Sequence, residues 1–217
     1  LRMVGTAAQV RESVGWGVDG VIAQGREAGG HLVGTVPALD FLPVALRTAG
    51  DRPVLLAGGI ATAADTRAAL DAGATGAVAG TRFLLTHESG AHPDYRQRVL
   101  DAEETIETTL FGLSWPVRHR VIPNAATRRW CRSDGSARAL PAALNAVSAP
   151  LARLADSVQG IALRVQRPAL PLFSPMVPLA GMPAAAVDRG ALYAGATGLR
   201  LDRVTSARQA VADLSPG

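Results

Sequence analysis

The sequence predicts an α/β fold in which parallel strands alternate with helices. Three observations support this prediction: short apolar runs recur along the first 80 residues, segments typical of helices separate them, and glycine-rich turns follow several of the runs. Short apolar runs bounded by turn residues are typical of buried strands, and strands that alternate with helices form right-handed parallel βαβ units. We expect strands at residues 1–4, 20–23, 54–57 and 76–79.

A faint internal repeat defines two of the helix-strand units. Thr6 and Thr62 each precede a helical segment and have a polar residue three positions later. A glycine follows eleven residues after each threonine, at Gly17 and Gly73. Because threonine caps helix N-termini and glycine commonly ends helices, each copy predicts a short helix followed directly by a strand. Between the copies, Pro37 suits the start of a further helix.

Two glycine-rich turns favour the C-terminal half of a (β/α)8 barrel, the TIM-barrel architecture. Gly58-Gly59 follow the third expected strand and Gly80-Thr81 follow the fourth. Barrels of this kind commonly bind phosphate at the loops after their last two strands. Only about four strands are expected, so the pattern indicates the second half of a barrel. A doubly wound open sheet is the alternative that the same pattern allows.

We expect the chain to divide into two regions. Residues 1–135 form the half-barrel, and residues 136–217 form an Ala-, Leu- and Pro-rich helical and loop extension that packs on it. Proline density and composition then predict the details of the second half. These details are a helix from His92-Pro93 to Leu100, irregular structure over 103–130, helix over 138–165, loop over 168–183 and a terminal helix over 207–214.

Composition excludes several classes of function. The net charge of +4 and the pI of about 10.4 come from 22 arginines without any lysine, and these arginines are scattered. We therefore expect no nucleic-acid binding, and the chain supplies no amine for Schiff-base catalysis. The lone Cys131 and the absence of Cys/His clusters predict a reducing compartment and no metal site. Without an apolar run of about 18 residues, we expect a cytoplasmic protein with no membrane span.

The glycine-rich turns are candidate phosphate-binding loops. The backbone N–H groups of Gly58, Gly59 and Gly80 would meet the negative charge, together with the Thr81 hydroxyl and the Arg82 side chain. The alternative is that the glycines merely permit tight turns between strand and helix. Two such turns in successive units favour phosphate binding.

His31 is the candidate catalytic residue. It ends the longest loop of the expected site and follows Gly29-Gly30, which would let a planar or bulky ligand come close. Histidine titrates near neutral pH and can move a proton to or from a substrate carbon. A surface or packing histidine is the ordinary alternative. Glu27 is the nearest carboxylate, and we expect it to brace the loop, whereas His92 is expected to begin a helix.

Four motifs together resemble the nitronate monooxygenase family, which consists of FMN-dependent barrels. The resemblance extends from residue 4 to about residue 130, with a weaker match around residues 192–195. No single motif is specific, but the four stand in order at natural spacing. They are Gln24-Gly25-x-Glu27-Ala28-Gly29-Gly30-His31, Ala57-Gly58-Gly59-Ile60, Gly80-Thr81-Arg82-Phe83 and Glu88-Ser89-x-Ala91-His92-Pro93-x-Tyr95.

The resemblance implies a cofactor, a reaction and a set of site residues. Alkyl nitronates would be oxidised by molecular oxygen to a carbonyl compound and nitrite, with His31 as the base or as the group that orients the nitronate. Both substrates are small molecules, and a homodimer is left open. FMN would be bound by Gln24 and Gly29 at the isoalloxazine ring and by Gly59, Gly80 and Thr81 at the phosphate, with Gly30, Gly58 and Ala79 as further cofactor-binding residues.

Two other functions fit the same residues. Flavin-dependent enoyl-ACP reductases resemble these motifs as well, and they would use His31 as a proton donor and NAD(P)H as the reductant. The third hypothesis is an inactive, truncated remnant or interaction module, because the family's first half is absent from this sequence. FMN binding separates the third hypothesis from the first two, and the choice of substrate separates the first two from each other.

Overall fold

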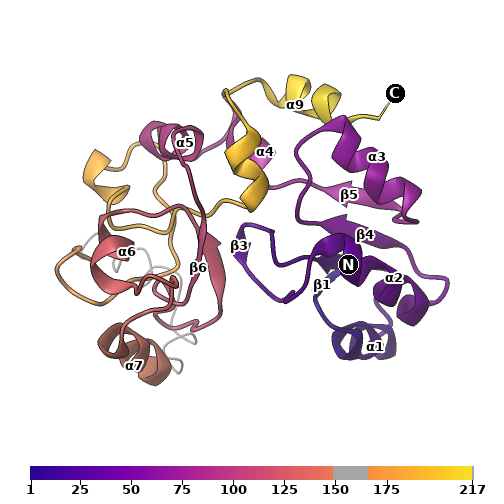
Figure 1. Ribbon diagram of the computed structural model, residues 1–217, viewed down its shortest axis with the longest axis horizontal. Coiled ribbons are helices and arrows are strands. Elements are labelled where there is room, and N and C mark those ends of the chain that lie inside the picture. Colours follow the sequence, from indigo (N-terminus) through magenta and orange to yellow (C-terminus); the bar gives the residue numbers. More distant parts are fainter. Residues whose placement is uncertain (149–165, 217) are drawn as a thin grey trace. The chain divides into compact units, whose positions relative to one another are not determined.

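The computed structural model describes residues 1–148 and 166–216, which divide into two compact units (Figure 1). One unit is Leu1–Ser89 with Gly195–Gly217, and the other is Gly90–Ala194. This division differs from the boundary that we expected near residue 135. The packing of residues 136–217 on a barrel stays a prediction, and residues 149–165 of the expected helix lie outside the described residues.

A four-stranded parallel sheet forms the centre of the first unit, in the order β1-β2-β4-β5. Its strands match the expected positions to within one residue at each end. Gln24 pairs with Ala57, and Ala57 pairs with Val78, so the last three strands end level with one another. The loops that follow them therefore leave the sheet at the same end. The strands are β1 (Arg2–Val4), β2 (Val21–Gln24), β4 (Val54–Ala57) and β5 (Gly76–Val78).

The predicted helix signals of the repeat are confirmed. The hydroxyls of Thr6 and Thr62 each accept a hydrogen bond from the N–H three residues later, at 3.2 and 3.3 Å. Gly17 and Gly73 have φ angles of 74° and 98°, the left-handed conformation expected after a helix end. Pro37 is the N-cap of the helix between the copies. The helices are α1 (Ala7–Gly15), α2 (Ala38–Ala49) and α3 (Ala63–Asp71).

The two faces of the sheet differ in burial. Val21, Val54 and Leu56 are at most 1% exposed and pack with the helices in one apolar core. On the opposite face, Ile22 and Leu55 lie next to each other in register and are only half-buried. Side chains alternate between the faces of a strand, so the helices cover one face of this sheet and leave the other partly open.

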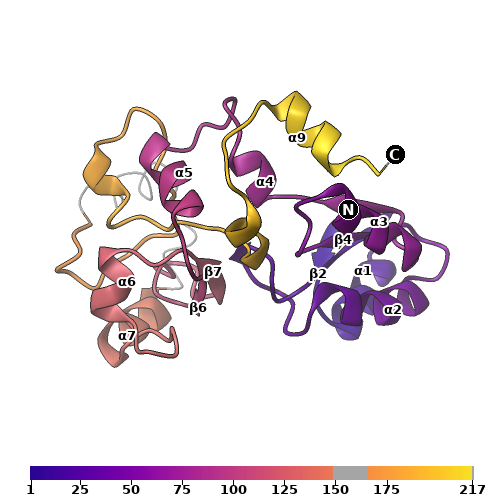
Figure 2. The same cartoon turned by 45° about the horizontal axis from the view of Figure 1, so that its top comes forward.

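The C-terminal residues complete the first unit. The short helices α4 (Thr81–Leu84) and η3 (Ala196–Arg200) contact each other, and α9 (Ala207–Leu214), at the predicted position, lies beside α3 and α4 (Figure 2). Arg82 on α4 is almost fully buried and forms an ion pair of 2.6 Å with Asp213 on α9. Segments far apart in the sequence therefore meet beside β5.

The second unit corrects the expectation of irregular structure over 103–130. An antiparallel strand pair crosses this segment, and a helix ends it. Glu107 forms ion pairs with Arg118 at 2.8 Å and Arg120 at 2.6 Å across the pair. The strands were missed because each has only three residues, too few for a visible alternation. The elements are α5 (Pro93–Leu100), β6 (Ile106–Thr108), β7 (His119–Val121), α6 (Ala125–Trp130), α7 (Ala139–Ser148) and η2 (Ala184–Ala186).

Candidate functional site

The turn after β4 lies against the loop after β2. Gly25 N–H donates a hydrogen bond of 2.9 Å to Ala57 O, and a Cβ on Gly58 would stand only 3.3 Å from Ala28 N. Gly58 and Gly59 have φ angles of 104° and 80°, which residues other than glycine rarely adopt. The sequence therefore needs glycine here both for the shape of the turn and for its close approach to the neighbouring loop.

Gly80 and Thr81 begin α4 directly after the end of β5. Apart from its chain neighbours, no atom of the described residues lies within 4 Å of a Cβ placed on Gly80, and the backbone of Gly80 is right-handed. The Thr81 hydroxyl accepts a hydrogen bond of 2.9 Å from Gly195 N–H. Ala79, between strand and turn, is half-buried against the apolar core. Because Gly80 is exposed and the space next to it is open, a ligand could contact its backbone. We call this space the cradle.

The donors of these turns fit the phosphate of a bound cofactor. Within residues 1–148 and 166–216, no hydrogen bond uses the N–H group of Gly59, Gly80 or Thr81 as its donor. Free backbone N–H groups that cluster at a turn attract anions. The chemistry of the donor set therefore agrees with the cofactor-phosphate role predicted from the glycine motifs.

His31 lies in the short strand β3 (Gly30–His31) and is half-buried. Burial lowers the pKa of its imidazole below the ordinary 6.5, because desolvation disfavours the charged form. The ring is therefore neutral near pH 7, the form in which it can accept a proton. Gly30 has a φ of 77°, and apart from its two chain neighbours no atom of the described residues lies within 4 Å of its Cβ position.

Gln24 braces the His31 loop. Its carboxamide nitrogen donates to His31 O at 3.0 Å, and its carboxamide oxygen accepts from Val33 N–H at 2.7 Å. The side chain is only 3% exposed. The sequence predicted a contact between Gln24 and a flavin ring, and that contact stays a prediction. The bracing of the loop is a further function that the motif did not indicate.

The expectation that Glu27 braces the loop is confirmed. Its two carboxylate oxygens accept hydrogen bonds of 2.9 and 3.2 Å from Ala38 N–H, at the start of α2. Pro37 provides no side-chain cap. The carboxylate of Glu27, eleven residues before Ala38, therefore accepts the hydrogen bond of an unpaired N–H group at this helix N-terminus. The same carboxylate lies 3.4 Å from the Cβ position of Gly59. Glu27 therefore connects the His31 loop, the start of α2 and the glycine turn.

His92 and His119, two other histidines, have structural roles within the second unit. His92 is the N-cap of α5, as expected, and its Nδ1 accepts from Asp94 N–H at 3.1 Å. His119 is fully buried in the second unit, where it stacks edge-on with Tyr193. No cluster of potential metal ligands occurs in the described part of the chain, and no helix there is long and apolar enough to cross a membrane.

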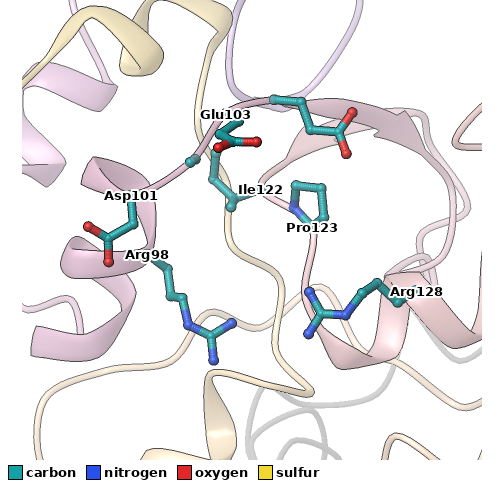
Figure 3. Close-up of a pocket in the computed structure, with 8 residues that line it drawn as sticks. Arg98, Asp101, Glu103, Ile122, Pro123 and Arg128 are labelled. Atoms are coloured by element: carbon teal, nitrogen blue, oxygen red, sulfur yellow. The ribbon is translucent and has the colours of Figure 1, made fainter.

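A pocket of about 270 Å³ lies in the second unit (Figure 3). Arg98 on α5 and Arg128 on α6 line it together with acidic side chains, and Arg98 forms an ion pair of 3.1 Å with Asp188. Its mixed charges select no single ligand class. None of the residues of the three strand-end loops lines this pocket.

Comparison with known proteins identifies the family. The family model "Nitronate monooxygenase" matches residues 1–217. The chain belongs to the nitronate monooxygenase family. A probable nitronate monooxygenase of Bacillus subtilis is 40% identical over 122 residues, which are 51% of this chain and 35% of that protein. The putative monooxygenase Rv1533 of Mycobacterium tuberculosis is 31% identical over 98% of this chain and 51% of its own length.

A solved structure supports the same assignment. The nitroalkane oxidase of Streptomyces ansochromogenes superposes with a TM-score of 0.69 at 27% identity, over 98% of this chain and 55% of that one. The chain thus spans about half the length, or less, of these proteins. The α/β fold with its parallel sheet and the family are therefore established.

Proposed function

We propose that this chain carries the FMN-binding and catalytic loops of an enzyme that oxidises alkyl nitronates with molecular oxygen to a carbonyl compound and nitrite. The observation that carries the proposal is the convergence of three glycine-containing loops at one end of the parallel sheet, with His31 among them. Family membership supplies the reaction class. The names of the relatives, which concern nitronates and nitroalkanes, support the substrate class.

The proposal gives each group a task. The free N–H groups of Gly59, Gly80 and Thr81 would hold the phosphate of FMN, and Gly58 and Ala79 would shape the two turns. Gln24, Gly29 and Gly30 would form the wall against which the isoalloxazine ring lies. Backbone N–H groups suit this task in a chain without lysine, because they supply donors without a cationic side chain.

FMN, when bound, supplies the redox chemistry of the reaction. His31 handles protons: its neutral imidazole can accept a proton from the carbon of a nitroalkane or hydrogen-bond to a nitronate oxygen. The half-buried position of the ring keeps it uncharged near pH 7. Gln24 holds the backbone of this residue through a hydrogen bond to His31 O, so a buried side chain helps to keep the residue in place.

We also propose that the sheet is the C-terminal half of a (β/α)8 barrel. Four parallel strands follow each other in spatial order, and helices cover only one face, as in the wall of such a barrel. The half-buried residues of the other face would then point to the barrel interior. The length of the relatives, about twice that of this chain, agrees with this proposal.

A glycine replacement tests the cofactor site. Gly80→Ala places a methyl group in the open space of the proposed phosphate cradle without backbone strain, so we expect the Kd for FMN to rise about tenfold or more. Gly15→Ala is the matched control, because its Cβ also meets no atom within 4 Å and it lies at the end of α1. Flavin fluorescence titration measures both. Equal FMN affinity in the Gly80→Ala variant and the wild type would contradict the proposed cradle.

The products decide between the reactions. Oxygen uptake and nitrite release from propyl nitronate, in the presence of FMN, are the expected results. Oxidation of NADH with an enoyl thioester, without nitrite formation, would assign the reductase function instead. A chain that binds FMN and performs neither reaction would contradict a catalytic role for these residues alone.

A further inference from the structure

Residues 195–200 contact each of the three loops of the proposed FMN site. The strand-end motifs of the site end at Phe83, more than a hundred residues earlier in the sequence, and the weaker match around residues 192–195 reaches only Gly195. Gly195 is the N-cap of η3 (Ala196–Arg200), and both belong to the first unit. We call residues 195–200 the clasp segment.

The first contact is with the turn after β5. Gly195 N–H donates a hydrogen bond of 2.9 Å to the Thr81 hydroxyl oxygen. A threonine hydroxyl can accept and donate at the same time. The bond therefore fixes the rotation of the Thr81 side chain and leaves its proton free for an acceptor such as a phosphate oxygen.

The second contact is with the His31 loop. Ala196 N–H donates to Glu27 O at 2.9 Å. A Cβ on Gly195 would stand 2.9 Å from Glu27 O and 3.0 Å from Gly29 N, and both are backbone atoms that cannot rotate away. Position 195 therefore requires glycine because of this close approach to another loop. Any larger residue would separate the clasp segment from the His31 loop.

The third contact is with the glycine turn after β4. One nitrogen of the Arg200 guanidinium donates to Gly59 O at 3.1 Å and to Asp65 Oδ2 at 2.8 Å. Asp65 in turn accepts from the N–H groups of Ala61 and Thr62 at the start of α3. The arginine thus attaches the carbonyl of Gly59 to the rigid N-terminus of a helix.

From these contacts we propose that the clasp segment sets the spacing of the three FMN-binding loops, with Gly195 and Arg200 as positioning residues. The inference rests on the proposed function for the identity of the ligand, but its contacts are properties of the unliganded chain. Arg200 is hydrogen-bonded to the turn that would hold the phosphate, through Gly59 O. Gly195 acts on Thr81 and on the loop that would lie beside the flavin ring.

Two substitutions separate these tasks. Arg200→Met keeps the length of the side chain and removes its donors, so FMN affinity should fall about tenfold, the effect of one lost charge-assisted hydrogen bond. Riboflavin, which lacks the phosphate, should bind to this variant as to the wild type. Gly195→Ala should weaken the binding of both FMN and riboflavin. Arg203→Met is the control, because Arg203 is exposed and lies 3.7 Å from its sequence neighbour Asp202.

Hydrogen exchange without flavin provides the independent readout. In the Arg200→Met variant, amide exchange should accelerate in residues 58–62 while the strands keep their protection. In the Gly195→Ala variant, it should accelerate in residues 25–31 and 80–84. Unchanged exchange in these loops, or equal losses of FMN and riboflavin affinity in Arg200→Met, would overturn the inference. If the wild type binds no FMN, the proposed function fails, and the exchange data still decide whether the clasp segment orders the loops.

Discussion

Polar residues at the end of β2 and in the loop after it act mainly on backbone atoms. The Gln24 side chain is hydrogen-bonded to His31 O and to Val33 N–H, and the Glu27 carboxylate is hydrogen-bonded to Ala38 N–H. Such contacts fix a loop at small cost, because each buried polar side chain is hydrogen-bonded. Motif residues therefore help to hold the backbone of the loop that presents His31 before any ligand arrives.

The burial of His31 predicts a pH dependence of stability. Its pKa lies below 6.5 in the folded chain, so between that lowered pKa and 6.5 the unfolded chain binds a proton that the folded chain does not. The stabilisation due to the neutral, buried ring is present above pH 6.5 and decreases as the pH falls through this window. His31→Asn should remove this part of the pH dependence.

Urea unfolding at about pH 5 and about pH 8 measures the effect. His87→Asn, at an exposed histidine of the same unit, is the matched control and should keep the wild-type dependence. If His31→Asn also keeps the wild-type dependence, the proposed neutral state of His31 is wrong.

At the scale of elements, the first unit follows its local signals. Threonine caps, left-handed glycines and short apolar runs placed α1, α3 and the strands correctly because each element has a signal within a few residues. The strands β6 and β7 have no such signal, because each has only three residues and pairs with a strand eleven or more residues away in the sequence. The weaker match around residues 192–195 included Gly195 but predicted no contact for it, and Arg200 was not predicted at all, because their partners become visible only after the chain has folded.

The N-terminus of α2 is capped by Glu27, a residue of the loop after β2. Because Glu27 replaces a local cap, Glu27→Ala should lower the free energy of unfolding by about 1–2 kcal/mol, as the loss of a good helix cap does. Glu27→Gln retains one acceptor oxygen and should cost less. Denaturant titration of the three proteins measures the difference. An unchanged stability of Glu27→Ala would show that the hydrogen bonds to Ala38 N–H do not stabilise the helix.

At the scale of the whole molecule, the two faces of the sheet should respond differently to substitution. Leu56 is 1% exposed in the helix-covered core, whereas Leu55 is half-buried on the other face. Leu56→Ala should therefore cost about 2–4 kcal/mol of stability, and Leu55→Ala about 1 kcal/mol or less. Denaturant titration of the 217-residue chain tests this contrast. Equal costs would mean that the second face is packed as tightly as the first, against the proposed open half-barrel.

The central claim is that the loops of this chain bind FMN. The most direct measurement is the visible absorption spectrum of the purified chain after incubation with FMN and gel filtration. We expect the protein fraction to keep a flavin spectrum that corresponds to about one FMN per chain. A colourless protein fraction, with all flavin in the small-molecule fraction, would contradict the claim.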